Sequence, residues 1–323
     1  MSALQRPVLI KPNAHTLWVS TLAAVVSTAC GGSSPSGPSN PSSPSPSASS
    51  QPLGAVPGLV SPVGGTQVSS DSPTFTARNA RGFDSGQANY TFEVMTQSMS
   101  RQVATMTVAA GRETTTATFA APLPRGMTLV WRVTARGSAG EAASTTSTFR
   151  LPAVDCRATR DPYAKSVVSW FVPACSLAGN QYNDPNEVLG PPNAGGFGPF
   201  NYRGFFSLGE DGWVVVDMEG CAVDQPGTDL RVYQAVGSEP VTVYAGGTPT
   251  GPWELLEYRK TCGDRVPGED KTIRECEFDL AAAEVQEARY FKIEDGELYP
   301  CALAETPSEG ADIDAVQLLH IKP

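Results

Sequence analysis

The chain has 323 residues and a formal net charge of −10 at pH 7, and 40% of its residues are hydrophobic. This length allows about two globular domains, and the hydrophobic content is sufficient for packed cores. The negative charge disfavours a nucleic-acid partner, because phosphate binding depends on basic side chains. We therefore expect a protein of about two domains whose partners are not nucleic acids.

The first segment has the parts of an export signal. Arg6 and Lys11 precede an apolar run from about Leu17 to Ala29, which is shorter than the roughly 20 apolar residues that span a bilayer. A basic region, a short apolar region and small residues before a cleavage point are typical of a secretory signal. We interpret residues 1–29 as a signal peptide.

Cys30 ends this segment and is a candidate for lipidation. Ser27-Thr28-Ala29-Cys30 resembles the lipobox of bacterial lipoproteins, with Ser27 where that family usually has Leu. The resemblance implies that acyl chains on Cys30 anchor the protein to a membrane. Gly31 stands where an inner-membrane retention signal has aspartate, which favours the outer membrane or the cell surface of the bacterial envelope. A plain secreted protein cut near Ala29 and a signal anchor are the alternatives.

Residues 30–56 form a linker. After Cys30 they are mostly Gly, Ser and Pro and carry no charge. Such a composition cannot bury enough apolar surface to offset chain entropy, so we expect disorder. At ~3.1 Å per residue the tether would reach roughly 80 Å, which would hold folded domains away from a membrane.

Charge divides the remaining chain near Pro152. Residues 57–152 contain 5 acidic and 8 basic residues, whereas residues 153–323 contain 28 acidic and 13 basic residues. All the cysteines after Cys30 lie in the second region. We therefore expect one domain over 57–152 and a second, strongly acidic domain over 153–323.

Residues 57–152 contain short β-rich runs between turn residues and no helical periodicity, which favours a β-sandwich. The runs LVSPVGG at 59–65, PTFTA at 73–77, YTFEV at 90–94 and LVWRVTARGSAG at 129–140 resemble fibronectin type III and related immunoglobulin-like modules. In the last run Trp131 is expected in the core, on the same side as Leu129, Val133 and Ala135. Modules of this kind usually act as spacers.

Residues 153–323 also contain strand-like runs, for example GWVVVD at 212–217 and VTVYA at 241–245, so both domains are expected to be all-β. The runs VLGPPN at 188–193, FSLGEDGWVVVDM at 206–218, ARYFKIED at 288–295 and ADIDAV at 311–316 resemble the galactose-binding-like jelly rolls. That superfamily includes discoidin domains and many cell-surface carbohydrate-binding modules. The resemblance implies a binding domain, often with a structural calcium ion.

Two segments carry the oxygen ligands that calcium prefers. One contains Asp184 and Asn186, and the other contains Asp312 and Asp314, which share one side of a strand. Two carboxylates held together need a compensating cation or donor, so we predict a structural calcium site from these residues. An Asx turn at the first segment and solvent exposure of the second are the alternatives.

The Gly/Pro-rich segment 191–206 is rich in aromatic residues, and exposed aromatic rings on a rigid scaffold can stack on sugar rings. The alternative is that Phe205 and Phe206 begin a strand and that the other rings cover the edge of the core. The candidate ligand-binding residues are Phe197, Phe200, Asn201, Tyr202 and Arg203.

The six cysteines after Cys30 indicate disulfides in an exported chain, and six cysteines allow 15 connectivities. Cys262 and Cys276 flank a polar loop whose closure favours their pairing. Elimination then leaves Cys156–Cys175 and Cys221–Cys301 as expected bonds.

The sequence lacks the motifs of common enzyme classes. Its only histidines are His15 and His320, and it contains no GxSxG, HExxH or P-loop pattern. A glycosidase needs only two carboxylates and stays open as a weaker alternative. We therefore expect a protein that is not an enzyme: a lipid-anchored surface protein that recognises a glycan with the help of calcium. The alternative is a structural protein that contacts envelope proteins.

Overall fold

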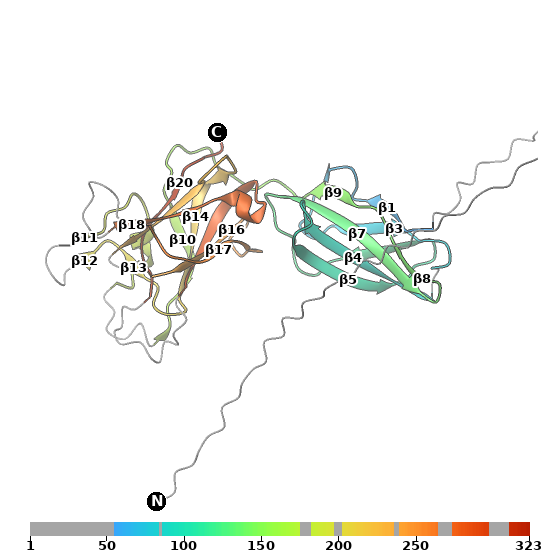
Figure 1. The fold of residues 1–323 in the computed structure, drawn as a ribbon. Coiled ribbons are helices and arrows are strands. Elements are labelled where there is room, and N and C mark those ends of the chain that lie inside the picture. Colours follow the sequence, from blue (N-terminus) through green and yellow to red (C-terminus); the bar gives the residue numbers. More distant parts are fainter. Residues whose placement is uncertain are drawn as a thin grey trace, which may run out of the picture. The chain divides into compact units, whose positions relative to one another are not determined.

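The computed structural model describes residues 55–83, 86–174, 182–196, 202–235, 239–263, 273–296 and 310–323, all within one compact unit, Ser50–Pro323. Nearly all the regular structure in these ranges is β-strand (Figure 1), and the exceptions are the short 3-10 helices η1 (Pro185–Val188) and η2 (Leu280–Ala283). The all-β prediction is confirmed. No described helix has the length and apolar character needed to cross a membrane. Cys30 and residues 31–54 of the predicted linker lie outside the described residues.

The strands before residue 152 form two sheets. The first has the order β1-β3-β6, and the second has the order β2-β9-β7-β4-β5 with β8 paired to β7. The strands are β1 (Gly58–Ser61), β2 (Thr66–Gln67), β3 (Thr74–Arg78), β4 (Ala88–Thr96), β5 (Gln102–Ala109), β6 (Thr114–Thr118), β7 (Thr128–Gly137), β8 (Gly140–Ala143) and β9 (Ser147–Arg150).

Alternation of apolar residues places one core between these two sheets. Leu129, Trp131, Val133 and Ala135 of β7 all belong to this core, as predicted. Trp131 is fully buried, and its indole nitrogen donates a hydrogen bond of 2.6 Å to the carbonyl oxygen of Pro62. A buried indole N–H needs such a partner, so Trp131 has a structural role.

The strands after residue 152 form a second sandwich. A five-stranded sheet has the order β10-β14-β19-β16-β17, a four-stranded sheet has the order β13-β20-β15-β18, and β11 pairs with β12. The strands are β10 (Ser166–Phe171), β11 (Gly195–Gly196), β12 (Tyr202–Arg203), β13 (Phe206–Ser207), β14 (Trp213–Val223), β15 (Leu230–Ala235), β16 (Val241–Gly246), β17 (Glu254–Lys260), β18 (Ile273–Phe278), β19 (Glu287–Asp295) and β20 (Asp312–Leu318).

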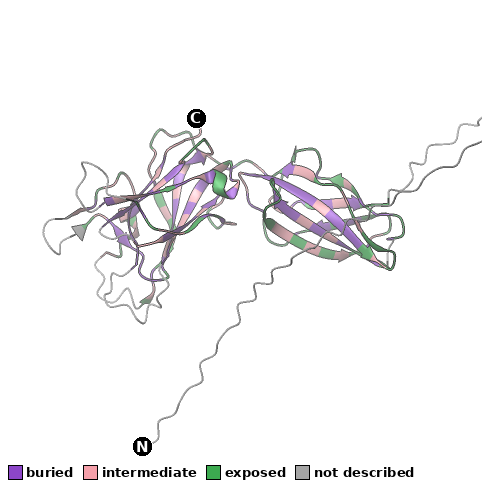
Figure 2. Ribbon diagram, viewed as in Figure 1, coloured by how far each residue is buried: buried purple, intermediate pink, exposed green. Residues whose placement is uncertain are grey.

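The core of the second sandwich takes alternate residues from both sheets. Val214 and Val216 of β14 are buried in it, together with Phe291 and Ile293 of β19 and Val316 of β20. Figure 2 shows the buried residues along these central strands. The residues between them on β14 and β19 therefore lie on the outer face of the five-stranded sheet.

The disulfides correct part of the predicted pairing. Cys262 pairs with Cys276 as predicted, but Cys156 pairs with Cys221. The predicted bonds Cys156–Cys175 and Cys221–Cys301 are therefore both wrong. Elimination failed because β14 brings Cys221 beside the segment that leads into β10, where the backbone N–H of Arg157 donates a 2.8 Å hydrogen bond to Glu219. Cys175 and Cys301 lie outside the described residues.

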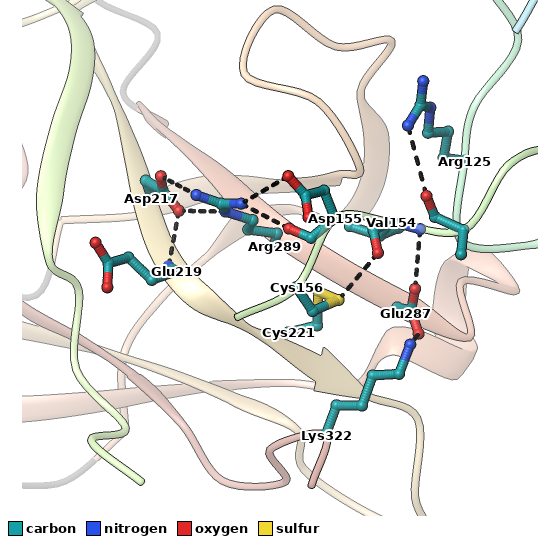
Figure 3. The surroundings of a disulfide bond; sticks show 11 residues. Arg125, Val154, Asp155, Cys156, Asp217, Glu219, Cys221, Glu287, Arg289 and Lys322 are labelled. Atoms are coloured by element: carbon teal, nitrogen blue, oxygen red, sulfur yellow. Dashed lines mark hydrogen bonds and ion pairs between the residues drawn. A yellow bond between two sulfur atoms is a disulfide. The ribbon is translucent and has the colours of Figure 1, made fainter. Parts of the chain in front are cut away.

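Charged side chains support the Cys156–Cys221 bond (Figure 3). The Arg289 guanidinium donates two hydrogen bonds, of 2.7 and 2.8 Å, to the carboxylate of Asp217, and a third to the carbonyl oxygen of Asp155. Glu287 accepts a 3.1 Å hydrogen bond from the backbone N–H of Val154. These contacts hold the start of the second sandwich in place.

Candidate functional site

Asp312 is a buried carboxylate at the start of β20. Its side chain is 7% exposed, and its Oδ1 atom has no hydrogen-bond partner. Burial raises the pKa of Asp312 well above its usual range, a hydrogen bond with Ser207 opposes this, and the charge of Glu239 adds to the increase. An unpartnered buried carboxylate oxygen is an unfavourable arrangement that a bound cation would relieve.

Asp314, two residues further along β20, is fully buried. Its Oδ1 atom accepts hydrogen bonds from the backbone N–H groups of Asn193, at 2.9 Å, and Ala194, at 3.2 Å. Asp314 therefore contacts the segment between η1 and β13, whereas Asp312 contacts Ser207 of β13 itself. The predicted alternative that these two aspartates are simply exposed to solvent is wrong.

Asp184 and Asn186 form a local turn. Asp184 is the N-cap of η1, and its Oδ1 atom accepts hydrogen bonds from the backbone N–H of Asn186, at 3.0 Å, and from its side-chain amide, at 2.9 Å. This is the Asx turn that the sequence left open. Within the described ranges no hydrogen bond joins this turn to Asp312 or Asp314, although η1 and β20 pack against each other.

The predicted sugar-binding segment is described only in part. Phe197, Phe200 and Asn201 lie outside the described residues. Tyr202 and Arg203 form β12, which pairs with β11, and Arg203 is exposed. The next two rings are structural, since Phe205 is 2% exposed and Phe206 is fully buried at the start of β13. This agrees with the alternative reading that Phe205 and Phe206 lead into a strand.

The outer face of the five-stranded sheet carries aromatic side chains that the sequence analysis did not single out. Phe171 of β10 pairs with Trp213 of β14, and their ring centroids are 6.4 Å apart. Trp213 pairs in turn with Glu294 of β19, and Tyr244 of β16 pairs with Lys292 of β19. We call these five residues, Phe171, Trp213, Tyr244, Lys292 and Glu294, the aromatic face.

Lys292 lies at the centre of the aromatic face. Its Nζ atom is 5.1 Å from the ring centroid of Trp213 and 5.8 Å from that of Tyr244, and it forms an ion pair with Glu294. Burial raises the pKa of Tyr244 to about 12, and a hydrogen bond and the charge of Glu294 contribute to the shift. The Tyr244 hydroxyl is therefore neutral at physiological pH and can donate a hydrogen bond.

The aromatic face is partly open to solvent. Phe171 is 47% exposed, and Leu255, which pairs with Tyr244 from β17, is 44% exposed. Trp213 and Tyr244 are half-buried. From β10 to β16 the face crosses three strand spacings, or about 14 Å. Flat apolar rings thus alternate with hydrogen-bonding groups along an accessible strip.

A group of carboxylates, Asp224, Asp229 and Asp279, also lies close together. Burial and the charges of the other two carboxylates raise the pKa of Asp224. Asp229, however, is fully buried and accepts hydrogen bonds of 3.0 Å from the backbone N–H groups of Gln225 and Leu280, and its Oδ1 atom lies 2.9 Å from Nδ1 of His320. Asp229 therefore ties a turn, η2 and the chain after β20 together.

Comparisons with known proteins identify no family. No protein-family model matches the chain, and the curated proteins contain no match to it. Among solved structures, the secreted serine protease VesC from Vibrio cholerae is similar at 13% sequence identity and a TM-score of 0.26. The similarity covers 84% of this chain and 52% of the protease chain, so this chain spans about half the protease.

One expectation from the sequence, that the protein is not an enzyme, is corrected. The absence of familiar motifs led us to expect a protein that is not an enzyme, and we withdraw that expectation. Sequence motifs were a weak basis for it, because catalytic groups are recognised by geometry and can lie far apart in the chain. At a TM-score of 0.26 the similarity carries no argument for any particular activity.

Proposed function

We propose that the protein recognises a glycan, and that the aromatic face of the second sandwich is the binding surface. The observation that carries the proposal is the set of partly exposed rings, Phe171 on β10, Trp213 on β14 and Tyr244 on β16, on one face of one sheet. Rings of this kind present flat apolar surface with few rotatable bonds. The apolar face of a sugar ring is the complementary shape.

The polar groups of the face would orient the sugar. Lys292 is a donor, the Glu294 carboxylate is an acceptor, and the neutral Tyr244 hydroxyl can serve as either. They lie between and beside the rings, so a sugar stacked on Trp213 would have its hydroxyl groups within reach of them. A binding site with a few placed polar groups on a largely apolar lining is the usual arrangement for small ligands.

Calcium would act as a structural ion in this proposal. Asp312 and Asp314 of β20 would hold it, because Asp312 offers a buried oxygen without a partner and a carboxylate is a hard oxygen ligand. A bound ion would supply the charge compensation that lets Asp312 ionise, and it would fix the segment of Asn193 and Ala194, which Asp314 contacts. Asp184 and Asn186 already satisfy each other and are the weaker half of the predicted site.

The proposed location follows from the amino terminus. Acylation of Cys30 would anchor the protein to a bacterial membrane, and the linker would present both sandwiches at the outer membrane or the cell surface. A binding domain held in this way gains from multivalency, because many anchored copies meet one glycan together. Modest affinity of each aromatic face would then suffice.

The test is a glycan array with the purified protein, run with calcium and with EDTA, followed by titration of any hit with variants. We expect Trp213→Ala to weaken binding by about tenfold, as loss of ring stacking implies. Trp170→Ala is the matched control, since Trp170 is 43% exposed on the same strand as Phe171 but packs against Phe206.

Equal effects of the two tryptophan variants would show that the aromatic face is not the site. Absence of glycan binding by the folded wild-type protein would contradict the proposal that the protein recognises a glycan. A partner recovered by cross-linking in the envelope would then support the assembly role. Loss of binding in EDTA with retention of the fold would support the calcium ion.

A further inference from the structure

The basic residues of the first sandwich are all arginines, and most of them have a hydrogen-bond or ion-pair partner. Residues 57–152 contain 8 basic residues, and all of them are arginine. Four form ion pairs and Arg150 donates a hydrogen bond to Thr128. The ion-paired residues are Arg101, Arg125, Arg132 and Arg136.

The three other arginines lie together. Arg78, at the end of β3, and Arg81 and Arg112, in neighbouring turns, line one depression of about 540 Å³. All three side chains are exposed, and within the described part of the chain none has an ion pair or a side-chain hydrogen bond. The arginines without partners are therefore the ones that share a pocket.

The backbone beneath this pocket is held firmly. Asn79 is 6% exposed; its backbone N–H donates a 2.9 Å hydrogen bond to the carbonyl oxygen of Glu113, and its side-chain amide donates a 2.8 Å hydrogen bond to Gly111. The Thr115 hydroxyl donates to the Asn79 side-chain oxygen at 2.7 Å. Asn79 thus fixes the turn that carries Arg112 against the strand that carries Arg78. The backbone positions from which the two arginine side chains extend are therefore held at a fixed separation.

We propose that Arg78, Arg81 and Arg112 form a binding site for a phosphate monoester. The guanidinium group is planar and its N–H donors match the oxygens of phosphate in pairs. Among the described residues, Glu113 is the acidic residue that lines the pocket, so three positive charges and one negative charge give these residues a net charge of +2. A phosphate monoester carries about −1.5 to −2 at neutral pH, whereas a diester or a carboxylate carries a single negative charge.

The monoester can come from a soluble phosphate ester or from a lipid headgroup. The pocket lies at the end of the sandwich where the described chain enters it, because Gly58 of β1 pairs with Arg78. On the lipid-anchor prediction this end is joined through the linker to Cys30. Both sources present the same group, so the experiment includes both.

The experiment titrates the full-length protein with methyl phosphate and with dimethyl phosphate by isothermal calorimetry. We expect methyl phosphate to bind more tightly, and its binding to weaken from pH 7.5 to pH 5, because the monoester loses its second charge near pH ~6. Arg78→Gln and Arg112→Gln should each weaken it by about tenfold, the value of one charge-assisted hydrogen bond.

Arg136→Gln is the matched control, because Arg136 is an exposed arginine of the same sandwich that is already paired with Glu141. Circular dichroism and the melting temperature check that each variant is folded. Equal weakening by Arg136→Gln, equal binding of the two phosphates, or no binding of methyl phosphate would overturn the proposal.

A second arm distinguishes the sources. The protein is sedimented with vesicles that contain phosphatidic acid, a monoester lipid, or phosphatidylglycerol, a diester lipid, in phosphatidylcholine. Sedimentation with phosphatidic acid alone, lost in Arg78→Gln, assigns the lipid headgroup. Binding of methyl phosphate without vesicle binding assigns a soluble ester. Vesicle binding that the arginine variants leave unchanged would contradict the site.

Discussion

The Cys156–Cys221 bond leads to the most quantitative prediction. Cys156 and Cys221 are 65 residues apart, whereas Cys262 and Cys276 are 14 residues apart. A disulfide stabilises mainly by restricting the unfolded chain, and its contribution rises with the length of the closed loop. The loop-entropy relation gives about 4.3 kcal/mol for the longer loop and about 3.0 kcal/mol for the shorter one.

Loss of either disulfide should change the folded state only slightly. The segment around Cys156 stays attached to the second sandwich through Arg157, Val154 and Asp155, whose hydrogen bonds to β14 and β19 do not involve sulfur. Both bonds also include a fully buried cysteine, Cys221 or Cys276. Replacement by alanine therefore leaves similar small cavities, and the difference between the two losses reflects the loops.

The assay is urea unfolding of the wild-type protein and of two double variants, Cys156→Ala/Cys221→Ala and Cys262→Ala/Cys276→Ala. We expect the first double variant to lose about 1.4 kcal/mol more free energy of unfolding than the second, from the ratio of loop lengths. Non-reducing peptide mapping of the wild type should recover both bonds. An equal or smaller loss for Cys156→Ala/Cys221→Ala would refute the reasoning.

Two further predictions concern single residues of the second sandwich. Because its folded pKa is raised, Asp312 contributes stability below the unfolded carboxyl pKa of about 3.9 and loses it as pH rises through the folded pKa. In EDTA at pH 7, Asp312→Asn should therefore raise the free energy of unfolding, whereas calcium should stabilise only the wild type; identical pH profiles in urea unfolding would contradict this. Gly212→Ala should lower the melting temperature sharply, because a Cβ atom at Gly212 would lie 1.8 Å from the carbonyl oxygen of Leu208; an unchanged melting temperature would contradict the close approach.

Short-range patterns predicted the strands well. Alternation in residues 129–135 placed Trp131 in the core with Leu129, Val133 and Ala135, all of which are buried there. These assignments depend only on which side of its own strand a residue occupies. Alternation with a period of two is visible in the sequence, so the inward and outward sides of a strand could be predicted.

The order of the strands in the sheets could not be predicted from the sequence in the same way. The order β10-β14-β19-β16-β17 joins strands that are far apart in the chain, and it alone places Trp213 and Tyr244 on either side of Lys292. Each of these residues occupies an outward position of its own strand, and an outward aromatic residue was the available signal. Without the register, nothing indicated that three such positions share one face. The wrong pairing of Cys156 has the same cause.

The hydrogen bonds and ion pairs of each charged side chain distinguish charges that stabilise the fold from charges that could bind a ligand. Amino-acid composition cannot make this distinction. Asp184 was predicted to be a calcium ligand, but both Asp184 and the fully buried Asp229 are engaged by local donors. Asp312 keeps a buried oxygen without a partner. Among the arginines of the first sandwich, ion pairs account for four, and Arg78 belongs to the small group that keeps its donors available. A charge that folding leaves uncompensated is available to a ligand, so each of the two proposed ionic sites includes a charged group whose described contacts leave it without an ionic partner.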